Sequence, residues 1–330
     1  AIILIGAGSG FAVSHWHASQ TENALEILQS EALPLNSPVD RASVLLANNN
    51  ADSDTLSVTL PTNDAEIIIE SVAFNPRSKS GEKPFTRLEA QEIGISQPIE
   101  FSIRDMWPPF WEGRSISGGD IDLDGDNDLV LASTVNGLYF YKNDGQGKFE
   151  KHDVNLGKIS DWPIFNAALV DFNNDGWLDI FLTTYQKGNY ILWNQEGLFS
   201  ETKLTAVKNN PDALLSLALS FGDVDKDGYI DSAIGNWAAG WYRRIPGEES
   251  RNRLIINDKG RMSGDQYIDL PGLPGETLSI LLSDINGNAN LDLLVGNDFE
   301  VPDFYYYGDG QGEFSQIFRN DNVIPFTTDT

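Results

Sequence analysis

Short apolar runs, each bounded by polar turn residues, follow one another along residues 85–330. The runs over 129–132, 167–170, 180–183 and 278–282 are four or five residues long and mostly Leu, Ile, Val and Ala. Runs this short, with Gly, Asn and Asp at their ends, are typical of β-strands, whereas a helix needs about ten residues or more. The sequence therefore predicts an all-β domain.

Four acidic loops of one design separate pairs of these runs: loop 1 (120–128), loop 2 (171–179), loop 3 (223–231) and loop 4 (284–292). Asp or Asn stands at positions 1, 3, 5 and 9 of each, and position 7 offers a backbone carbonyl. The candidate ligands in loops 1 and 2 are Asp120, Asp122, Asp124, Asp126 and Asp128, and Asp171, Asn173, Asp175, Trp177 and Asp179. Those in loops 3 and 4 are Asp223, Asp225, Asp227, Tyr229 and Asp231, and Asp284, Asn286, Asn288, Asn290 and Asp292.

This spacing of oxygen atoms predicts sites for Ca²⁺, which takes about six to eight oxygen ligands in a flexible geometry. An EF-hand loop would need a bidentate Glu at position 12 and a helix on each side. Position 12 is apolar in every loop: Leu131, Leu182, Ile234 and Val295. An ordinary Asp- and Gly-rich turn is the alternative for any single loop. Four loops in register favour cation sites between strands.

Loop 4 departs from the pattern at two positions. Asn288 replaces Asp at position 5, and Ala289 replaces the Gly that the other loops have at position 6. Fewer carboxylates and a stiffer turn predict a weaker site or an empty one. We therefore expect three calcium sites, with loop 4 as a doubtful fourth.

The loops recur with a period that indicates the blades of a β-propeller. Their first residues are 51, 52 and 61 positions apart, and several strands fit in each interval. Asp144-Gly145 and Asp309-Gly310 predict hairpin turns later in the unit, and a Phe a few residues on would begin the next strand. The sequence Ile324-Pro-Phe326 is similar to the segments that lead into loops 1 and 2, so we expect an incomplete propeller chain.

These motifs make residues 85–330 resemble the FG-GAP/VCBS repeat family, the integrin-α-like calcium β-propellers, and in particular the ASPIC/UnbV-like secreted bacterial proteins. The resemblance implies blades of about 50–60 residues and calcium ions with a structural role. The loop motif is specific for the repeat class and says little about what the protein binds.

We expect four segments along the chain. They are a hydrophobic N-terminal anchor or helix over 1–33, a linker over 34–54, a small β accessory or irregular blade over 55–84, and the propeller with four motif-bearing blades over 85–330. Residues 1–13 are apolar and uncharged but shorter than a bilayer span. A membrane anchor and the remnant of a signal sequence are both open for this stretch.

Charge and composition limit the partners. The formal net charge is −27, from 49 acidic and 22 basic residues, which argues against nucleic acid as a partner. The chain has no cysteine, so thiolate chemistry and disulfides are excluded. Weak calcium sites suit compartments with about millimolar calcium. We therefore expect a periplasmic or extracellular protein, tethered to the membrane by its N-terminal segment.

For the function we expect a protein-interaction module, or an accessory subunit that docks on an integral membrane complex through residues 1–17. With three His and no hydrolase or zincin motif, the sequence offers little for an enzyme. Residues that suit a partner or glycan lie after loop 3, although core packing would also explain the tryptophans. They are Trp237, Trp241, Tyr242, Arg243 and Arg244. The alternative function is a carbohydrate-binding domain or a propeller-type polysaccharide lyase or hydrolase.

Overall fold

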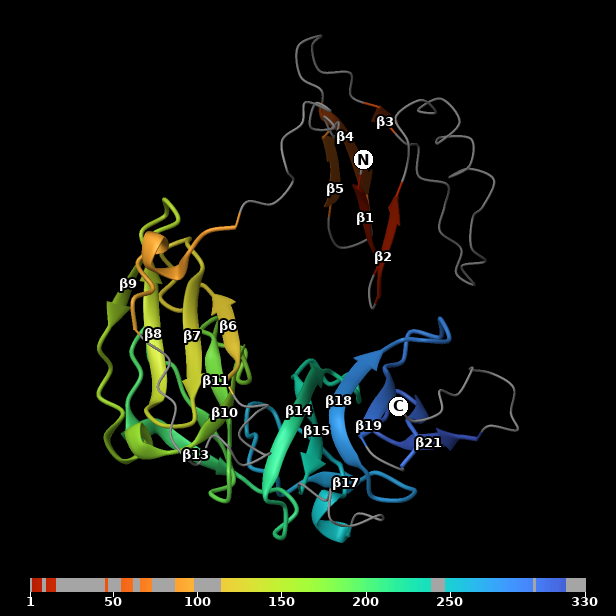
Figure 1. Cartoon of the computed structure of the whole chain (residues 1–330). Coiled ribbons are helices and arrows are strands. Elements are labelled where there is room, and N and C mark those ends of the chain that lie inside the picture. The colour runs from red at the N-terminus through yellow and green to blue at the C-terminus, as the bar shows by residue number, and fades with distance from the viewer. Residues whose placement is uncertain are drawn as a thin grey trace. The chain divides into compact units, whose positions relative to one another are not determined.

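The structure, a computed structural model, describes two units of the chain, Ala1–Thr86 and Arg87–Thr330 (Figure 1). In the first unit it describes the backbone of five strands. In the second it describes residues 87–97, 114–238, 247–298 and 301–318 with their side chains.

The strands of the first unit form two small sheets. β1 (Ile2–Ala7) pairs with β2 (Gly10–His15), and β3 (Leu45–Leu46), β4 (Thr55–Pro61) and β5 (Glu66–Val72) form an antiparallel sheet. β4 and β5 lie within residues 55–84, the segment expected to be a small β accessory or irregular blade.

The structure corrects the predicted N-terminal hydrophobic helix, because Ile2–Ala7 and Gly10–His15 form paired antiparallel strands instead. The apolar run lacks a helical period, and its β-branched isoleucines and its glycines around residue 8 favour strand and turn. A short strand, β3, lies inside the predicted linker. The rest of the segment expected to be an anchor or helix, residues 16–33, falls outside the described residues. Among the described residues, the structure contains no helix with the length and apolar character of a membrane span.

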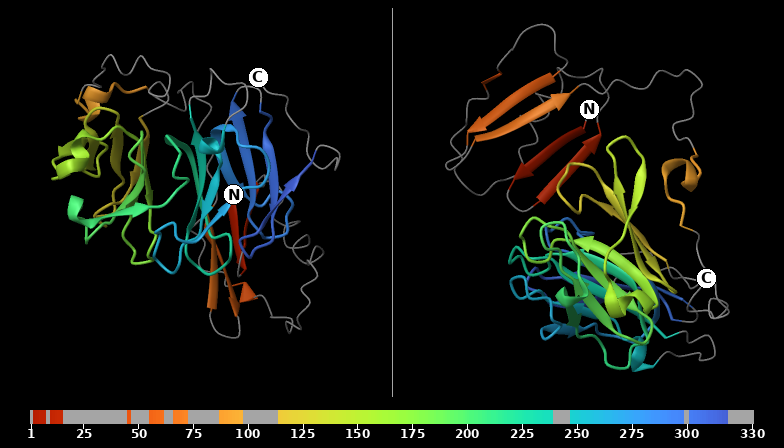
Figure 2. Two further views of the ribbon diagram at one scale, coloured as in Figure 1. Left: turned by 90° about the horizontal axis from the view of Figure 1, so that it is seen from below. Right: turned by 90° about the vertical axis from the view of Figure 1, so that its left-hand side faces the viewer.

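The described residues of the second unit contain four antiparallel four-stranded sheets, each a meander in chain order (Figures 1 and 2). Blade 1 contains β6 (Ile116–Gly119), β7 (Asp128–Ser133), β8 (Gly137–Asn143) and β9 (Phe149–His152). Blade 2 contains β10 (Ile164–Val170), β11 (Asp179–Thr184), β12 (Asn189–Leu192) and β13 (Leu204–Val207). Blade 3 contains β14 (Leu215–Gly222), β15 (Asp231–Trp237), β16 (Arg253–Ile255) and β17 (Tyr267–Asp269). Blade 4 contains β18 (Glu276–Ser283), β19 (Asp292–Asp298), β20 (Phe304–Gly308) and β21 (Phe314–Ile317).

The helical turns among the described residues are short 3₁₀ segments: η1 (Ala90–Ile93), η4 (Gly157–Asp161), η5 (Glu201–Lys203) and η7 (Glu248–Ser250). The all-β fold with four motif-bearing blades is thereby confirmed. Phe149 and Phe314 begin the last strands of blades 1 and 4, as predicted. In blade 2 the last strand begins at Leu204, because η5 follows Phe199.

The apolar core lies between successive blades. One cluster joins blades 1 and 2, a second joins blades 2 and 3, and a third joins blades 3 and 4. At the second junction Phe172 packs against Phe181 of its own blade and edge-on against Phe221 of β14, with ring centroids 5.9 and 5.7 Å apart. Each blade is therefore stabilised by its neighbours.

Burial along the second strands follows from this stacking. β11 and β15, in the two central blades, are buried at every residue, whereas β7 alternates between buried and half-buried positions. The sequence of a strand that is covered on both faces is a continuous apolar run. The sequence of a strand that is covered on a single face alternates between apolar and polar residues. This difference explains why the run over 180–183 has no period of two.

Candidate metal centres in the four loops

Each acidic loop joins the first strand of its blade to the second. The acid at position 9 is the first residue of the second strand: Asp128, Asp179, Asp231 and Asp292. The predicted placement of the loops between strands is therefore confirmed.

The carboxylate at position 1 organises the turn. One oxygen of Asp120 accepts the N–H of Asp124 at 3.1 Å, and the other accepts the N–H of Gly125 at 2.9 Å. The other three loops repeat both bonds at 2.8–3.2 Å. The chain is thus wrapped around one carboxylate, with the side chains at positions 3 and 5 close by.

The wrapping requires positive φ at positions 4 and 6. Loops 1 to 3 have a non-glycine residue at position 4 and glycine at position 6, whereas loop 4 has Gly287 (φ 75°) and then Ala289 (φ 63°). Loop 4 therefore has the same backbone, with the glycine at the other position.

We predict that Ala289→Gly stabilises the protein by about 1 kcal/mol, because an L-residue at positive φ carries a cost that glycine avoids. The reverse change Gly228→Ala in loop 3 should cost a similar amount, and a Cβ there meets no atom within 4 Å, so φ alone is tested. Urea unfolding measures both. An Ala289→Gly variant no more stable than the parent would contradict the assignment of strain to this residue.

Loops 1 and 3 bring three carboxylates together. One oxygen from each of Asp120, Asp122 and Asp124 lies within 4.8 Å of the others, and the same holds for Asp223, Asp225 and Asp227. The Oδ1 atom of Asp122 is buried and has no hydrogen-bond partner. A cluster of carboxylate oxygens with a buried, unsatisfied acceptor fits a hard divalent cation. In loops 2 and 4 an Asn occupies position 3.

The acid at position 9 ties the loop to a more distant hairpin. Asp231 is fully buried, and its oxygens accept the N–H of Val224 at 2.8 Å and the N–H of Asn257 at 2.8 Å. The other three blades repeat both bonds at 2.8–3.4 Å. Burial raises the pKa of Asp179 and of Asp231 to about 7, although these N–H groups act in the opposite direction.

Blades 1, 2 and 3 have an asparagine at or just after the end of the third strand: Asn143, Asn194 and Asn257. In blades 2 and 3 this asparagine bonds the preceding blade, so we call its place the bridging position. Asn194 Nδ2 donates to Leu178 O of its own blade at 3.1 Å and to Ile121 O in loop 1 of the preceding blade at 2.8 Å. Asn257 bonds Ile230 O and Phe172 O of loop 2 in the same way. These asparagines were not predicted from the sequence. The feature that could have revealed them is an Asn at the same place in three successive repeats.

The hairpin turn of each next blade also covers position 3 of the loop before it. A Cβ on Gly197 would lie 3.2 Å from Asp122 Cβ, and one on Gly260 would lie 3.2 Å from Asn173 Cα. Each of these loops is therefore part of a junction between blades.

We predict that Asn257→Ala costs about 2–3 kcal/mol of unfolding free energy and that Asn143→Ala costs about 1 kcal/mol. Asn257 is fully buried and bridges two blades, whereas the bonds of Asn143 stay within blade 1, to Asn127 O and from the N–H of Gly145. Denaturant unfolding of the two variants is the measurement. Equal losses would contradict a bridging role.

The residues predicted for a partner lie mostly outside the described structure. Trp237 ends β15 and is buried in a cluster with Phe165 and Leu215, so it packs in the core. Trp241, Tyr242, Arg243 and Arg244 fall outside the described residues.

The four blade-like sheets of the described residues, with an acidic loop between the first and second strand of each, define a propeller-like repeat. A comparison with protein families agrees: the FG-GAP-like repeat matches residues 120–182 and 171–234, which include loops 1 to 3. Residues 120–234 therefore contain FG-GAP-like repeats. The chain's closer placement among ASPIC/UnbV-like proteins stays a prediction.

Among curated proteins, the chain is similar to integrin alpha chains. It is 31% identical to integrin alpha-3 of Cricetulus griseus over 144 residues, 39% of this chain and 13% of the relative. It is 31% identical to integrin alpha-6 of Homo sapiens over 81 residues, 22% of this chain and 7% of the relative. The chain thus spans less than a fifth of the length of these relatives.

Among solved structures, a similar one is that of an Agrocybe aegerita lectin that recognises non-reducing terminal N-acetylglucosamine. Its TM-score is 0.36 at 15% identity, over 83% of this chain and 77% of that one. A similarity of this size carries no functional argument.

Proposed function

We propose that loops 1 to 3 bind Ca²⁺ as structural ions, and that loop 4 binds it more weakly. The observation that supports this most strongly is the gathering of three carboxylates in loop 1 and in loop 3. Loop 1 also lies at the junction that Asn194 and Gly197 form with blade 2. The side chains at positions 1, 3, 5 and 9 and the carbonyl at position 7 would hold the ion. When bound, it neutralises the carboxylates and cross-links the turn.

We further propose that the repeat unit is a non-enzymatic protein-interaction module of an exported protein. The similarity to integrin alpha chains and the commitment of the clustered acids to loop structure support this. Residues 1–17 would tether it to the membrane or dock it on a membrane complex.

Fractionation of cells that express the full chain, with and without residues 1–17, tests the tether. Loss of the protein from the membrane fraction on deletion supports the tether, and an unchanged distribution contradicts it. Co-purification in calcium and in chelator tests the module, since a partner that needs ordered blades should be lost in chelator.

A glycan is the second candidate ligand, and a groove of about 510 Å³ between the outer edge of blade 2 and the connection from β16 to β17 in blade 3 favours it. Trp193, Ile256 and Met262 line it with Arg261 and Gln266 at its polar part, a combination of apolar and hydrogen-bonding groups that suits a sugar. Binding to a polysaccharide in affinity electrophoresis, lost in Trp193→Ala, would support this function. Equal retardation of the variant would exclude this groove.

A further inference from the structure

We propose that Lys142 supplies, in calcium-free loop 1, the positive charge that calcium supplies when it is bound, so that loop 1 keeps its fold without calcium while loop 3 depends on it. The inference rests on the proposed calcium sites. Loops 1 and 3 have the same carboxylates at positions 1, 3, 5 and 9. The proposal implies that they nevertheless differ in how strongly their folding depends on calcium.

The contact that carries the inference joins β8 to loop 1. Lys142 Nζ lies 2.5 Å from Asp122 Oδ2, with the lysine side chain 35% exposed and the aspartate 18%. The second oxygen of Asp122, Oδ1, is buried and has no hydrogen-bond partner. One oxygen of the position-3 acid is thus paired with a fixed cation, and the other is left for a mobile one.

The other blades lack this lysine. The residue before the bridging position is Trp193 in blade 2, Ile256 in blade 3 and Tyr307 in blade 4. Loop 2 lowers its charge differently, because Asn173 stands at position 3 and its amide donates to Asp175 at 2.9 Å. In loop 3, within the described part of the chain, no side-chain N–H donor reaches the carboxylates of Asp223, Asp225 or Asp227.

The electrostatics of position 3 agree with the geometry. The hydrogen bond from Lys142 lowers the pKa of Asp122, whereas burial, Asp227 and Asp223 raise the pKa of Asp225, the same residue type at the same position. Carboxylates that repel each other in a partly desolvated loop destabilise the fold until a cation arrives.

One substitution made at the same position of both loops tests the inference. In chelator, Asp122→Asn should lower the melting midpoint by about 3–6 °C, because Lys142 loses its partner. Asp225→Asn should raise it by about 2–4 °C, because one of three repelling charges is removed. A shift of the same sign for both variants would overturn the proposal.

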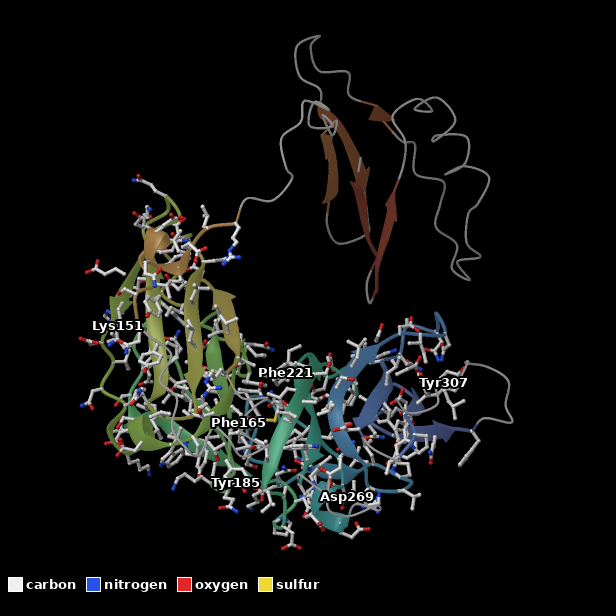
Figure 3. The ribbon with its side chains drawn as sticks, in the orientation of Figure 1. Lys151, Phe165, Tyr185, Phe221, Asp269 and Tyr307 are labelled. Carbon is white, nitrogen blue, oxygen red and sulfur yellow. The ribbon has the colours of Figure 1, made fainter. Side chains whose placement is uncertain are left out.

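Lys142→Met gives the complementary test. It should lower the midpoint in chelator by about 3–6 °C, and saturating calcium should restore it. By linkage, loop 1 of this variant then binds calcium about tenfold more tightly, which corresponds to 1.4 kcal/mol. The matched control is Lys151→Met, on β9 of the same blade (Figure 3), whose exposed ammonium lies 3.5 Å from Asp153 and should shift the midpoint little.

A Lys142→Met variant that behaves like Lys151→Met in chelator, or whose loss persists in calcium, would overturn the role of the lysine. Failure of the calcium sites is a separate result. It appears as a wild-type midpoint that calcium does not move, while the comparison of Asp122→Asn with Asp225→Asn in chelator still reports the pairing.

Discussion

Replacing Asp231 by asparagine should destabilise the protein by about 3–5 kcal/mol, both with calcium and without it. Both oxygens of the fully buried Asp231 accept backbone N–H bonds, from Val224 and Asn257. An amide has one acceptor oxygen, so its NH₂ group would face a second donor. The loss should lower the melting midpoint by about 10 °C.

The calcium-free condition separates this role from ligation. Asp227→Asn is the matched control, since Asp227 is exposed and belongs to the same loop. In chelator Asp227→Asn should cost little, because one repelling charge is lost, whereas Asp231→Asn should keep its full effect. If Asp231→Asn were harmless in chelator, the acid at position 9 would be a metal ligand without the structural role described above.

Removing calcium should have the largest effect of all. At a free calcium concentration about 100 times the dissociation constant, each site contributes about 2.7 kcal/mol, so three sites contribute about 8 kcal/mol. For a unit of this size that corresponds to a midpoint about 15–30 °C lower in chelator. Thermal melts at matched ionic strength measure the difference.

Magnesium is the control for the melts. It prefers a rigid octahedral geometry and keeps its water, so an equal concentration should restore only a small part of the stability. A midpoint that is the same in chelator and in calcium would contradict the proposed sites.

The sequence predicted the features that depend on neighbouring residues. Stretches of about ten residues determine where the loops, the strands around them and the hairpin turns at Asp144 and Asp309 lie. The structure places all of these as expected. The Asp at position 1 makes its bonds within five residues, so the pattern can be recognised in a short stretch of sequence.

Contacts between blades could not be predicted from such short stretches of sequence. Asn194 meets Ile121 across 73 positions, and the pairing of Lys142 with Asp122 needs two strands in register. Neither Asn194 nor Lys142 belongs to a motif that is visible within about ten residues of sequence. The prediction of a helix at the N-terminus was wrong for another reason. An uncharged apolar stretch without a period fits a helix and a strand equally well.

In loop 4, a prediction from a single residue gave the wrong backbone. Ala289 predicted a stiffer turn, yet the loop keeps the same hydrogen bonds because Gly287 supplies the other position with positive φ. What distinguishes loop 4 is therefore its two amide side chains at positions 3 and 5, which bring no charge to a cation.

A calcium titration of the calcium-stripped chain tests the central claim most directly. Isothermal titration calorimetry should detect at least three bound ions per chain, with a weaker one that is lost first when calcium is limiting, assigned to loop 4 by its absence in Asp284→Ala. No binding heat up to millimolar calcium, from protein whose fold is intact by circular dichroism, would contradict the claim that these loops are calcium sites.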